Sequence, residues 1–299
     1  MECHYPPSME KINREIEAHI HKNKDLAQLF ELYKKVLNAQ LDYLNEIHVS
    51  VNLSEEEIKN CFRNGQYLMS KQKFDVDVDL FKNIFLSLCK AIKKASPGAP
   101  DSLQQLCDAE EFETDNLKEL LDKIKLFSKQ KLEDFIKNRE MDKKTGVDGE
   151  IIVFVFFSAL SPFYSLFMKE VRKIVDFSLW RRGYCPVCGQ TAVIAKHRSE
   201  DGARVLHCWL CHAEWVYPRL VCPYCENKDQ KQLRFFYVPG DKSRQVHVCE
   251  KCKKYLKTID MKITQKDVHL DVEAIATGYL DIVAEREGYR APDEAALLN

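Results

Sequence analysis

Apolar residues recur at helical spacing through the first 180 residues of the chain. Between Leu26 and Ile47 they are separated by three or four positions, which predicts one long amphipathic helix with a continuous apolar stripe. Residues 78–92 and residues 117–136 repeat the same period. The pattern therefore predicts an α-helical bundle over residues 1–180.

Capping and turn residues mark the helix boundaries. Ser54, followed three positions later by Glu57, matches a capping box and predicts the start of a helix. A proline-rich segment at residues 96–100 and a polar segment at residues 137–149 are expected to separate helices. The bundle is therefore expected to contain several breaks.

One uncharged stretch of 18 residues, from Ile151 to Met168, is long enough to be considered as a membrane span. Serines and the Ser161-Pro162 step interrupt it, and the charged residues 169–173 continue it as an amphipathic helix. These features favour a buried core helix over a membrane helix. Residues 1–7 contain neither a basic nor an apolar segment, so we expect no signal peptide and a cytoplasmic location.

After Trp180 the pattern changes to short β-type runs separated by turns. Residues 192–195 and 203–206 flank one polar turn, and residues 233–238 and 245–248 flank another. Runs of this length on either side of a turn are typical of β-hairpins. The sequence therefore predicts two hairpins after the bundle.

The C-terminal region predicts one more strand and a helix. Residues 255–261 form the last β-type run. Asp271 is expected to cap the helix that follows, and the tail after Gly288 is expected to be loose. The apolar face of that helix would consist of Val272, Ile275, Ala276, Tyr279, Leu280 and Val283.

Eight of the 12 cysteines lie between residues 185 and 252, and all eight occur as CxxC pairs. A disulfide framework requires an oxidising compartment, and we find no signal in the sequence that would direct the chain to one. Metal ligation is therefore favoured. The candidate ligands are Cys185, Cys188, Cys208, Cys211, Cys222, Cys225, Cys249 and Cys252. The isolated cysteines, expected to be small buried side chains, are Cys3, Cys61, Cys89 and Cys107.

An internal repeat indicates how the eight cysteines are grouped. Cys185 and Cys222 begin similar segments 37 positions apart, and each segment leads into a hairpin that ends in another CxxC pair. The simplest grouping joins each CxxC segment to the end of its own hairpin and gives two four-cysteine sites. An interleaved grouping, in which the two modules share ligands, is the alternative.

Two four-cysteine sites favour a structural role over catalysis. Four thiolates surround a divalent ion completely and leave no position for a substrate or an activated water. Zinc and iron both accept four sulfur ligands, so the sequence predicts two metal ions per chain, iron or zinc. The chain has no glycine-rich phosphate loop, nucleophile elbow or zinc-protease motif, so we predict no catalytic residue.

Histidines and glycines near the cysteines refine this picture. His197, His207, His212 and His247 are expected to surround the metal sites or to lie on the surface, because eight cysteines already complete two sites. Only Gly189 supplies the usual glycine after a CxxC pair. The second site is therefore expected to be looser than the first.

Charge says little about partners. The chain carries 45 Lys and Arg against 46 Asp and Glu, whereas residues 181–260 carry 15 basic against 8 acidic residues. Two ions with eight thiolates reduce that local excess to about three positive charges, which permits but does not require binding to nucleic acid.

The candidate partner contacts, between the two modules, are Glu214, Trp215 and Arg219. The alternative is that they only fix the module junction.

Several segments carry motifs of a known family. The C-terminal part contains GYCPVCG at residues 183–189, LHCWLCHAEW at 206–215, Arg219, CPYC at 222–225, CEKCKKYLK at 249–257, and Leu280, Asp281, Ala284, Gly288 and Tyr289. The helical part adds LNAQ at residues 37–40, DVDLF at 77–81 and ALSPF at 159–163. These motifs resemble those of FdhE, the formate dehydrogenase accessory (formation) proteins, with the highest specificity over residues 180–289.

The resemblance and the patterns above imply an α+β fold. An α-helical domain at residues 1–180 would be followed by rubredoxin-like or zinc-ribbon modules at residues 181–218 and 219–262, and by a C-terminal helix and tail at residues 263–299. The resemblance also implies a chaperone-like, cytoplasmic maturation factor rather than an enzyme. Its partner would be the catalytic, molybdenum- or tungsten-containing subunit of a formate dehydrogenase during assembly.

Two other functions remain as alternatives. A double zinc ribbon with a basic excess is also compatible with a nucleic-acid-binding protein, although the balanced overall charge disfavours it. Iron at the cysteines would be compatible with a rubredoxin-like redox carrier. The sequence predicts no membrane partner and gives no oligomeric state.

Overall fold

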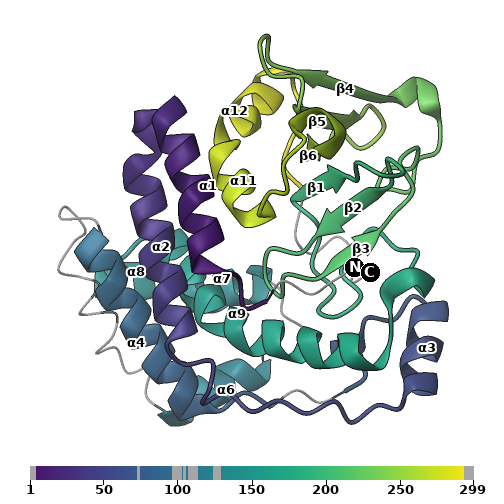
Figure 1. Cartoon of the computed structure of the whole chain (residues 1–299). Coiled ribbons are helices and arrows are strands. Elements are labelled where there is room, and N and C mark those ends of the chain that lie inside the picture. Colours follow the sequence, from purple (N-terminus) through teal and green to yellow (C-terminus); the bar gives the residue numbers. More distant parts are fainter. Residues whose placement is uncertain are drawn as a thin grey trace.

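The computed structural model describes residues 5–72, 75–95, 103, 106, 114–123 and 129–292. Most of the N-terminal helices lie on one side of the molecule and a β-sheet with its loops lies on the other, while the helix at residues 55–63 lies below the sheet (Figure 1). The fold is α+β, as predicted: a helical part, a sheet that carries two four-cysteine sets, and C-terminal helices. Cys3, Cys107, the predicted break at residues 96–100 and the end of the tail lie outside the described residues.

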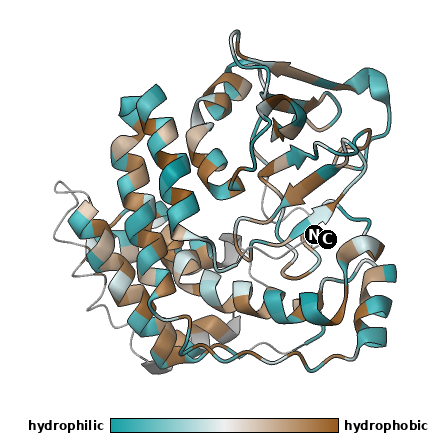
Figure 2. Cartoon of the chain, in the orientation of Figure 1, coloured by the Kyte–Doolittle hydropathy of each residue, from teal (hydrophilic) through white to brown (hydrophobic). Residues whose placement is uncertain are grey.

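A 26-residue helix, α9, is the centre of the helical part. It contacts α2, α4 and α7, so other helices cover several of its sides. Hydrophobic and hydrophilic residues alternate along α1 and α2 (Figure 2), as expected for amphipathic helices at the surface of a bundle. The bounds are α1 Met9–Lys22, α2 Ala27–Leu41, α3 Glu55–Arg63, α4 Val78–Ala95, α6 Thr114–Lys123, α7 Lys129–Asn138, α8 Met141–Thr145 and α9 Gly149–Ile174.

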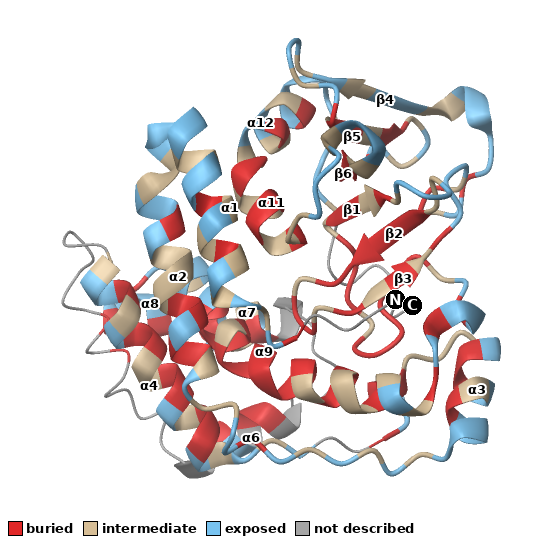
Figure 3. Cartoon of the chain, viewed as in Figure 1, coloured by how far each residue is buried: buried red, intermediate tan, exposed pale blue. Residues whose placement is uncertain are grey.

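Helix α9 is the buried apolar helix that its uncharged sequence predicts. By length and composition it could cross a membrane, but 78% of its apolar 18-residue window is buried inside the protein. Figure 3 shows this burial along the part of α9 that lies against the other helices. Pro162 is accommodated inside the helix, and the Ser165 hydroxyl donates to the Ser161 carbonyl at 2.7 Å. The core-helix prediction is confirmed.

Two helix boundaries differ from the sequence prediction. Helix α2 ends at Leu41, and the chain turns at residues 42–46, yet Ile47 is still buried. The apolar pattern of the sequence therefore continues beyond the last residue of the helix. Residues 117–136 fall in two helices, α6 and α7, rather than one. The predicted capping box is confirmed, since the Glu57 carboxylate accepts from the Ser54 N–H at 2.8 Å and the Ser54 hydroxyl accepts from the Glu57 N–H.

Within the described residues, six strands form one sheet in the order β3-β2-β1-β6-β5-β4. Both predicted hairpins are present, because β1 pairs antiparallel with β2 and β4 pairs antiparallel with β5. Strand β6 pairs antiparallel with β5 and parallel with β1, so it joins the hairpins into one sheet. The sequence pattern does not predict β3. The strands are β1 Ile194–His197, β2 Arg204–His207, β3 Glu214–Val216, β4 Leu233–Tyr237, β5 Arg244–Cys249 and β6 Tyr255–Asp260.

Short helices, rather than a single one, follow the last strand. They are α10 Met261–Thr264, α11 Leu270–Ala276 and α12 Gly278–Arg286. Helix α11 contacts α1 and β1, whereas α12 contacts β5 and β6. The prediction that Asp271 caps a helix is wrong: His269 occupies the N-cap position, and Asp271 lies in the first turn with its carboxylate toward His207 and His212.

Buried residues run continuously from the helical part into the first ribbon. One core cluster contains Phe163 and Tyr164 of α9 together with Leu206 and Leu210 of the ribbon. The domain boundaries at residues 180, 218 and 262 stay a prediction. What the structure adds is that the ribbons share a sheet, and that the first ribbon shares a core with α9.

A buried carboxylate fixes helix α11, which carries Asp271. The side chain of Glu273 is only 1% exposed and accepts from Arg244 Nη2 at 2.7 Å and Nε at 2.8 Å. His19 Nε2 of α1 lies 3.2 Å from the same carboxylate. Burial acts to raise the pKa of Glu273, but hydrogen bonds from His19 and Arg244 outweigh it and lower the pKa.

Replacing Glu273 by glutamine is expected to lower the free energy of unfolding by about 2 kcal/mol at pH 7, because the guanidinium loses a charged acceptor. A carboxyl whose folded pKa is depressed stabilises the protein above its ordinary value of 4.5 and loses that contribution as the pH falls through the folded pKa. The difference between wild type and Glu273→Gln should therefore shrink below pH 4.5. Urea unfolding at pH 7 and at acidic pH measures both quantities, and a pH-independent difference would contradict the assignment.

Candidate metal centres

Each of the four CxxC segments folds into the same backbone turn, which we call a knuckle. In the first, the Cys185 N–H donates to the Gln190 carbonyl at 2.8 Å and the Gly189 N–H donates to the Cys185 carbonyl at 3.0 Å. The same two hydrogen bonds recur in the knuckles that begin at Cys208, Cys222 and Cys249. The sequence repeat is therefore also a repeat of backbone geometry.

The residue after each knuckle's second cysteine is left-handed, with φ of 80° at Gly189, 55° at His212, 54° at Glu226 and 57° at Lys253. A side chain in this conformation costs about 1 kcal/mol or more, which is why glycine is usual there. Residues other than glycine occupy three of the four positions despite this cost, and their knuckles keep the same hydrogen bonds. Missing glycines therefore do not alter the knuckle geometry at either site.

The first set of sulfurs comes from the two knuckles of the first ribbon. Cys185 Sγ lies 3.4 Å from Cys211 Sγ, and Cys188 Sγ lies 3.5 Å from Cys208 Sγ and 3.7 Å from Cys211 Sγ. All four sulfurs lie within 4.8 Å of one another. Four sulfurs at about 2.3 Å from one tetrahedral ion would be about 3.8 Å apart. The spacing therefore suits a single ion.

The second set repeats this arrangement in the second ribbon. Cys222 Sγ lies 3.7 Å from Cys252 Sγ, and Cys225 Sγ lies 3.7 Å from Cys249 Sγ. These four sulfurs also lie within 4.8 Å of one another. The structure thus brings the cysteines together within each ribbon, as in the simpler of the two groupings, and not across the ribbons.

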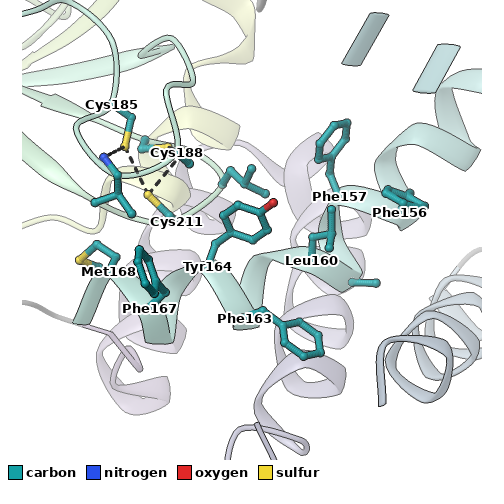
Figure 4. Packing of buried hydrophobic residues seen from close by; sticks show 14 of the residues in the cluster. Phe156, Phe157, Leu160, Phe163, Tyr164, Phe167, Met168, Cys185, Cys188 and Cys211 are labelled. Carbon is teal, nitrogen blue, oxygen red and sulfur yellow. Dashed lines mark hydrogen bonds between the residues drawn. The ribbon is translucent and has the colours of Figure 1, made fainter. Parts of the chain in front are cut away.

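The two sets differ in burial. All four cysteines of the first set are buried, and Figure 4 shows Cys185, Cys188 and Cys211 on the side of α9 that carries Tyr164. In the second set, Cys225 and Cys252 are partly exposed. Exposure of these two cysteines, rather than knuckle geometry, makes the second set the more accessible one.

The donor chemistry of both sets fits a divalent ion. Burial raises the pKa of the Cys188 and Cys211 thiols, so thiolates at these positions need a cation to hold their charge. The Val187 N–H lies 3.4 Å from Cys185 Sγ, and the Asn227 side-chain amide lies 3.7 Å from Cys249 Sγ. Such donors stabilise metal-bound sulfur. The two sets could therefore bind one metal ion each.

Comparisons with known proteins agree with these sites. The family model "FdhE, central domain" matches residues 184–219, which contain the whole first cysteine set. An FdhE homolog from Aquifex aeolicus is 25% identical over 267 residues, covering 88% of this chain and 85% of the homolog. The resemblance to the FdhE family is confirmed.

Other FdhE relatives extend this result. An FdhE homolog from Haemophilus ducreyi is 27% identical over 275 residues, covering 90% of this chain and 82% of the homolog. FdhE from Escherichia coli is 32% identical over 114 residues, or 36% of this chain and 35% of that protein. The crystal structure of FdhE from Pseudomonas aeruginosa covers 98% of this chain and 96% of its own, with a TM-score of 0.61 and 19% identity. That structural match shows a shared fold.

The three candidate partner contacts have different environments. Trp215 is 1% exposed and donates from its indole to the Arg182 carbonyl at 3.0 Å. The Glu214 carboxylate pairs with Lys196 at 2.8 Å, whereas Arg219 is exposed and donates to the Gly202 carbonyl at 3.3 Å. Their role in partner binding stays a prediction. Burial of Trp215 favours the alternative that this residue fixes the junction.

The junction between the ribbons is tightly packed around the CPYC segment. The Tyr224 hydroxyl donates to the Ala192 carbonyl at 2.9 Å, and the guanidinium of Arg204 donates to the carbonyls of Pro218 and Val221. Gly183 lies against the backbone of Pro223. The connection between the two cysteine sets is therefore held to the first ribbon along most of its length.

The four histidines near the cysteines divide into two pairs. His197 and His247 pack edge to face with ring centroids 5.1 Å apart. His207 and His212 instead converge on Asp271 of α11. Sequence reasoning missed this second group, because its carboxylate lies about sixty positions away in a helix that carries no metal-binding motif.

Proposed function

We propose that this chain is a metal-binding accessory factor that binds the catalytic subunit of a formate dehydrogenase during its assembly. The observation that carries the proposal is a pair of closed four-sulfur sets on one sheet, in a chain that resembles FdhE proteins over about nine tenths of its length. Closed sites shape a surface and offer no position for a substrate. The proposed activity is therefore binding rather than catalysis, and the proposed location is the cytoplasm.

The metal at each site is proposed to be iron or zinc, held by the eight cysteines named above. Both metals accept four thiolates in a tetrahedron, and either would fix the ribbon. Elemental analysis and visible absorption of anaerobically purified protein distinguish them, because zinc thiolate sites are colourless. A redox role requires iron.

The surface proposed to meet the partner lies on the second ribbon. Leu220 is 57% exposed and Phe235 is 56% exposed, which is unusual for large apolar side chains. Together with Arg219 they line a cavity of about 310 Å³ beside the second cysteine set. An apolar surface with basic residues at its edge has the composition of a protein-binding site.

Co-purification with a formate dehydrogenase catalytic subunit tests the function. Wild type is expected to retain the subunit, whereas Leu220→Asp should weaken the association at least about tenfold by placing a charge in the apolar contact. Ile263→Asp is the matched control, because Ile263 is 50% exposed but lies on α10, outside this cavity.

The two parts of the proposal fail in different ways. No association of wild type with any catalytic subunit would contradict the function. Association that survives Leu220→Asp, or that is lost equally in Ile263→Asp, would contradict the proposed surface and leave the function standing. Metal content of each variant, measured in parallel, verifies that the sites are intact.

A further inference from the structure

A third group of potential ligands lies beside the first cysteine set, since His207 directly precedes Cys208 and His212 directly follows Cys211. His207 ends β2, His212 follows the second knuckle and Asp271 lies in the first turn of α11. One donor atom from each lies within 4.8 Å of the other two. His207 Nε2 is 2.8 Å from Asp271 Oδ1, and His212 Nδ1 is 3.0 Å from Asp271 Oδ2. The three side chains come from separate elements and meet at one point.

Hydrogen bonding around His212 leaves one nitrogen free for a cation. The Ser161 hydroxyl donates to the Leu210 carbonyl at 2.8 Å, so its oxygen can only accept from His212 Nε2, 3.3 Å away. In the neutral ring, Nδ1 then carries a lone pair directed at the carboxylate. Neither His212 Nδ1 nor Asp271 Oδ2 makes a hydrogen bond of acceptable geometry to a described residue. A proton on Nδ1 would make this 3.0 Å contact an ion pair, and a metal ion between the two atoms would satisfy both lone pairs instead.

The other imidazole has a similar arrangement. If His207 binds a metal through Nε2, its other ring nitrogen, Nδ1, faces the Glu214 carboxylate at a distance of 3.8 Å. A carboxylate on the far side of a ligating histidine is a common feature of metal sites, because it orients the ring. Ser161 occupies the corresponding position for His212. On the side away from Asp271, His212 has a hydrogen-bond partner in Ser161, whereas His207 faces the Glu214 carboxylate without a hydrogen bond.

These side chains border a cavity of about 310 Å³ between the helical part, the first ribbon and α11. Tyr5 covers His212, with the two rings stacked 5.2 Å apart, and His269 Nδ1 lies 3.5 Å from Asp271 Oδ2. Three protein ligands beside a cavity leave coordination positions open, unlike four cysteines. The group thus differs from the cysteine sets in kind as well as in place.

The donor set selects a class of ion. Two imidazoles and one carboxylate suit divalent transition metals such as iron, cobalt, nickel or zinc, and they are the ligands of many open, three-ligand sites. Each imidazole offers one nitrogen to the ion and the carboxylate offers one oxygen.

We propose that His207, His212 and Asp271 form a third metal site, which binds one divalent transition-metal ion with positions open to the cavity. The ion would lie between the two imidazole nitrogens and the carboxylate, and would link the first ribbon to α11. This site is independent of the proposed function, because it rests on no partner. It also predicts three ions per chain rather than two.

Cobalt(II) titration of protein whose cysteine sites are already filled with zinc tests the proposal. Wild type is expected to bind one further equivalent without the intense near-ultraviolet bands of cobalt–thiolate bonds, because the third site has no sulfur. Asp271→Asn should bind that equivalent at least about tenfold more weakly. Asp267→Asn is the matched control, since Asp267 borders the same cavity but pairs with Lys11.

A second variant distinguishes loss of the third metal site from a folding defect. His212→Asn removes the imidazole and is tolerated at a φ of 55°, because asparagine enters the left-handed region readily. Both variants should keep two zinc ions, which shows that the ribbons are folded. The proposal would be overturned if wild type binds no third equivalent, if wild type and Asp271→Asn bind it equally tightly, or if the bound cobalt displays thiolate bands. Asp271 would then be an ion-pair partner of the histidines.

Discussion

Replacing Cys208 by serine is expected to release one metal ion per chain and to unfold the first ribbon together with the adjacent part of the helical core. Cys208 is fully buried and belongs to the same core cluster as Tyr164 of α9. Binding of a structural metal supplies on the order of 10 kcal/mol, which is comparable to the whole stability of an ordinary domain. Loss of this ion therefore removes most of what holds the centre of the molecule together.

The second cysteine set should respond differently. Cys225 is partly exposed, and the second ribbon adds no buried residue to the main core cluster except Leu256. Cys225→Ser is therefore expected to release one ion, to loosen the second ribbon and to leave α9 and the first ribbon folded. Elemental analysis with near-ultraviolet circular dichroism compares the two variants, because dichroism at these wavelengths reports packing of the buried aromatic residues.

Cys61→Ala is the matched control for both serine variants. Cys61 is also buried, at 7% exposure, but lies in α3 away from both sulfur sets. Its replacement should cost about 1 kcal/mol of stability and leave both ions in place. Full metal content in Cys208→Ser would show that Cys208 does not ligate, and a first ribbon that stays folded without its ion would show that the metal does not supply its stability.

Cysteine spacing predicts much of the site because a CxxC pair is a local structure. The knuckle needs only six consecutive residues for its two backbone hydrogen bonds, so the sequence contains all the information that forms it. The hairpins are equally local, and β1 with β2 and β4 with β5 pair as predicted. Local patterns of this kind also explain why the capping box at Ser54 and the burial of α9 could be predicted.

What the sequence could not predict depends on contacts between distant residues. The parallel pairing of β1 with β6 joins residues more than sixty positions apart, and β3 spans only three residues, too few for a periodic pattern. Asp271 matches the rule for helix caps, but it lies in the first turn of α11 with its carboxylate toward His207 and His212, and His269 is the N-cap instead. Helix α2 likewise stops before its apolar stripe does, because Ile47 is buried by packing in a non-helical segment.

Gly183→Ala is expected to displace the CPYC segment from the first ribbon, because Gly183 lies against the backbone that begins the second cysteine set. A Cβ atom on Gly183 would lie 1.9 Å from the Pro223 carbonyl oxygen and 2.6 Å from its carbonyl carbon. Neither atom belongs to a side chain that could move aside, so one backbone segment must shift. Displacement of packed backbone is expected to cost about 3 kcal/mol or more in the free energy of unfolding.

The same shift should expose the connection between the cysteine sets. Amide hydrogens of residues 217–224 are expected to exchange faster with solvent in Gly183→Ala, while both ions remain bound, because the knuckles themselves are unchanged. Gly278→Ala is the matched control: nothing lies within 4 Å of its added Cβ at the start of α12, so its stability should equal or exceed that of wild type by up to about 1 kcal/mol. Equal stability and equal exchange in Gly183→Ala and wild type would mean that the two backbones do not meet at Gly183, and that the CPYC segment is held to the first ribbon by side chains such as Arg204 and Tyr224.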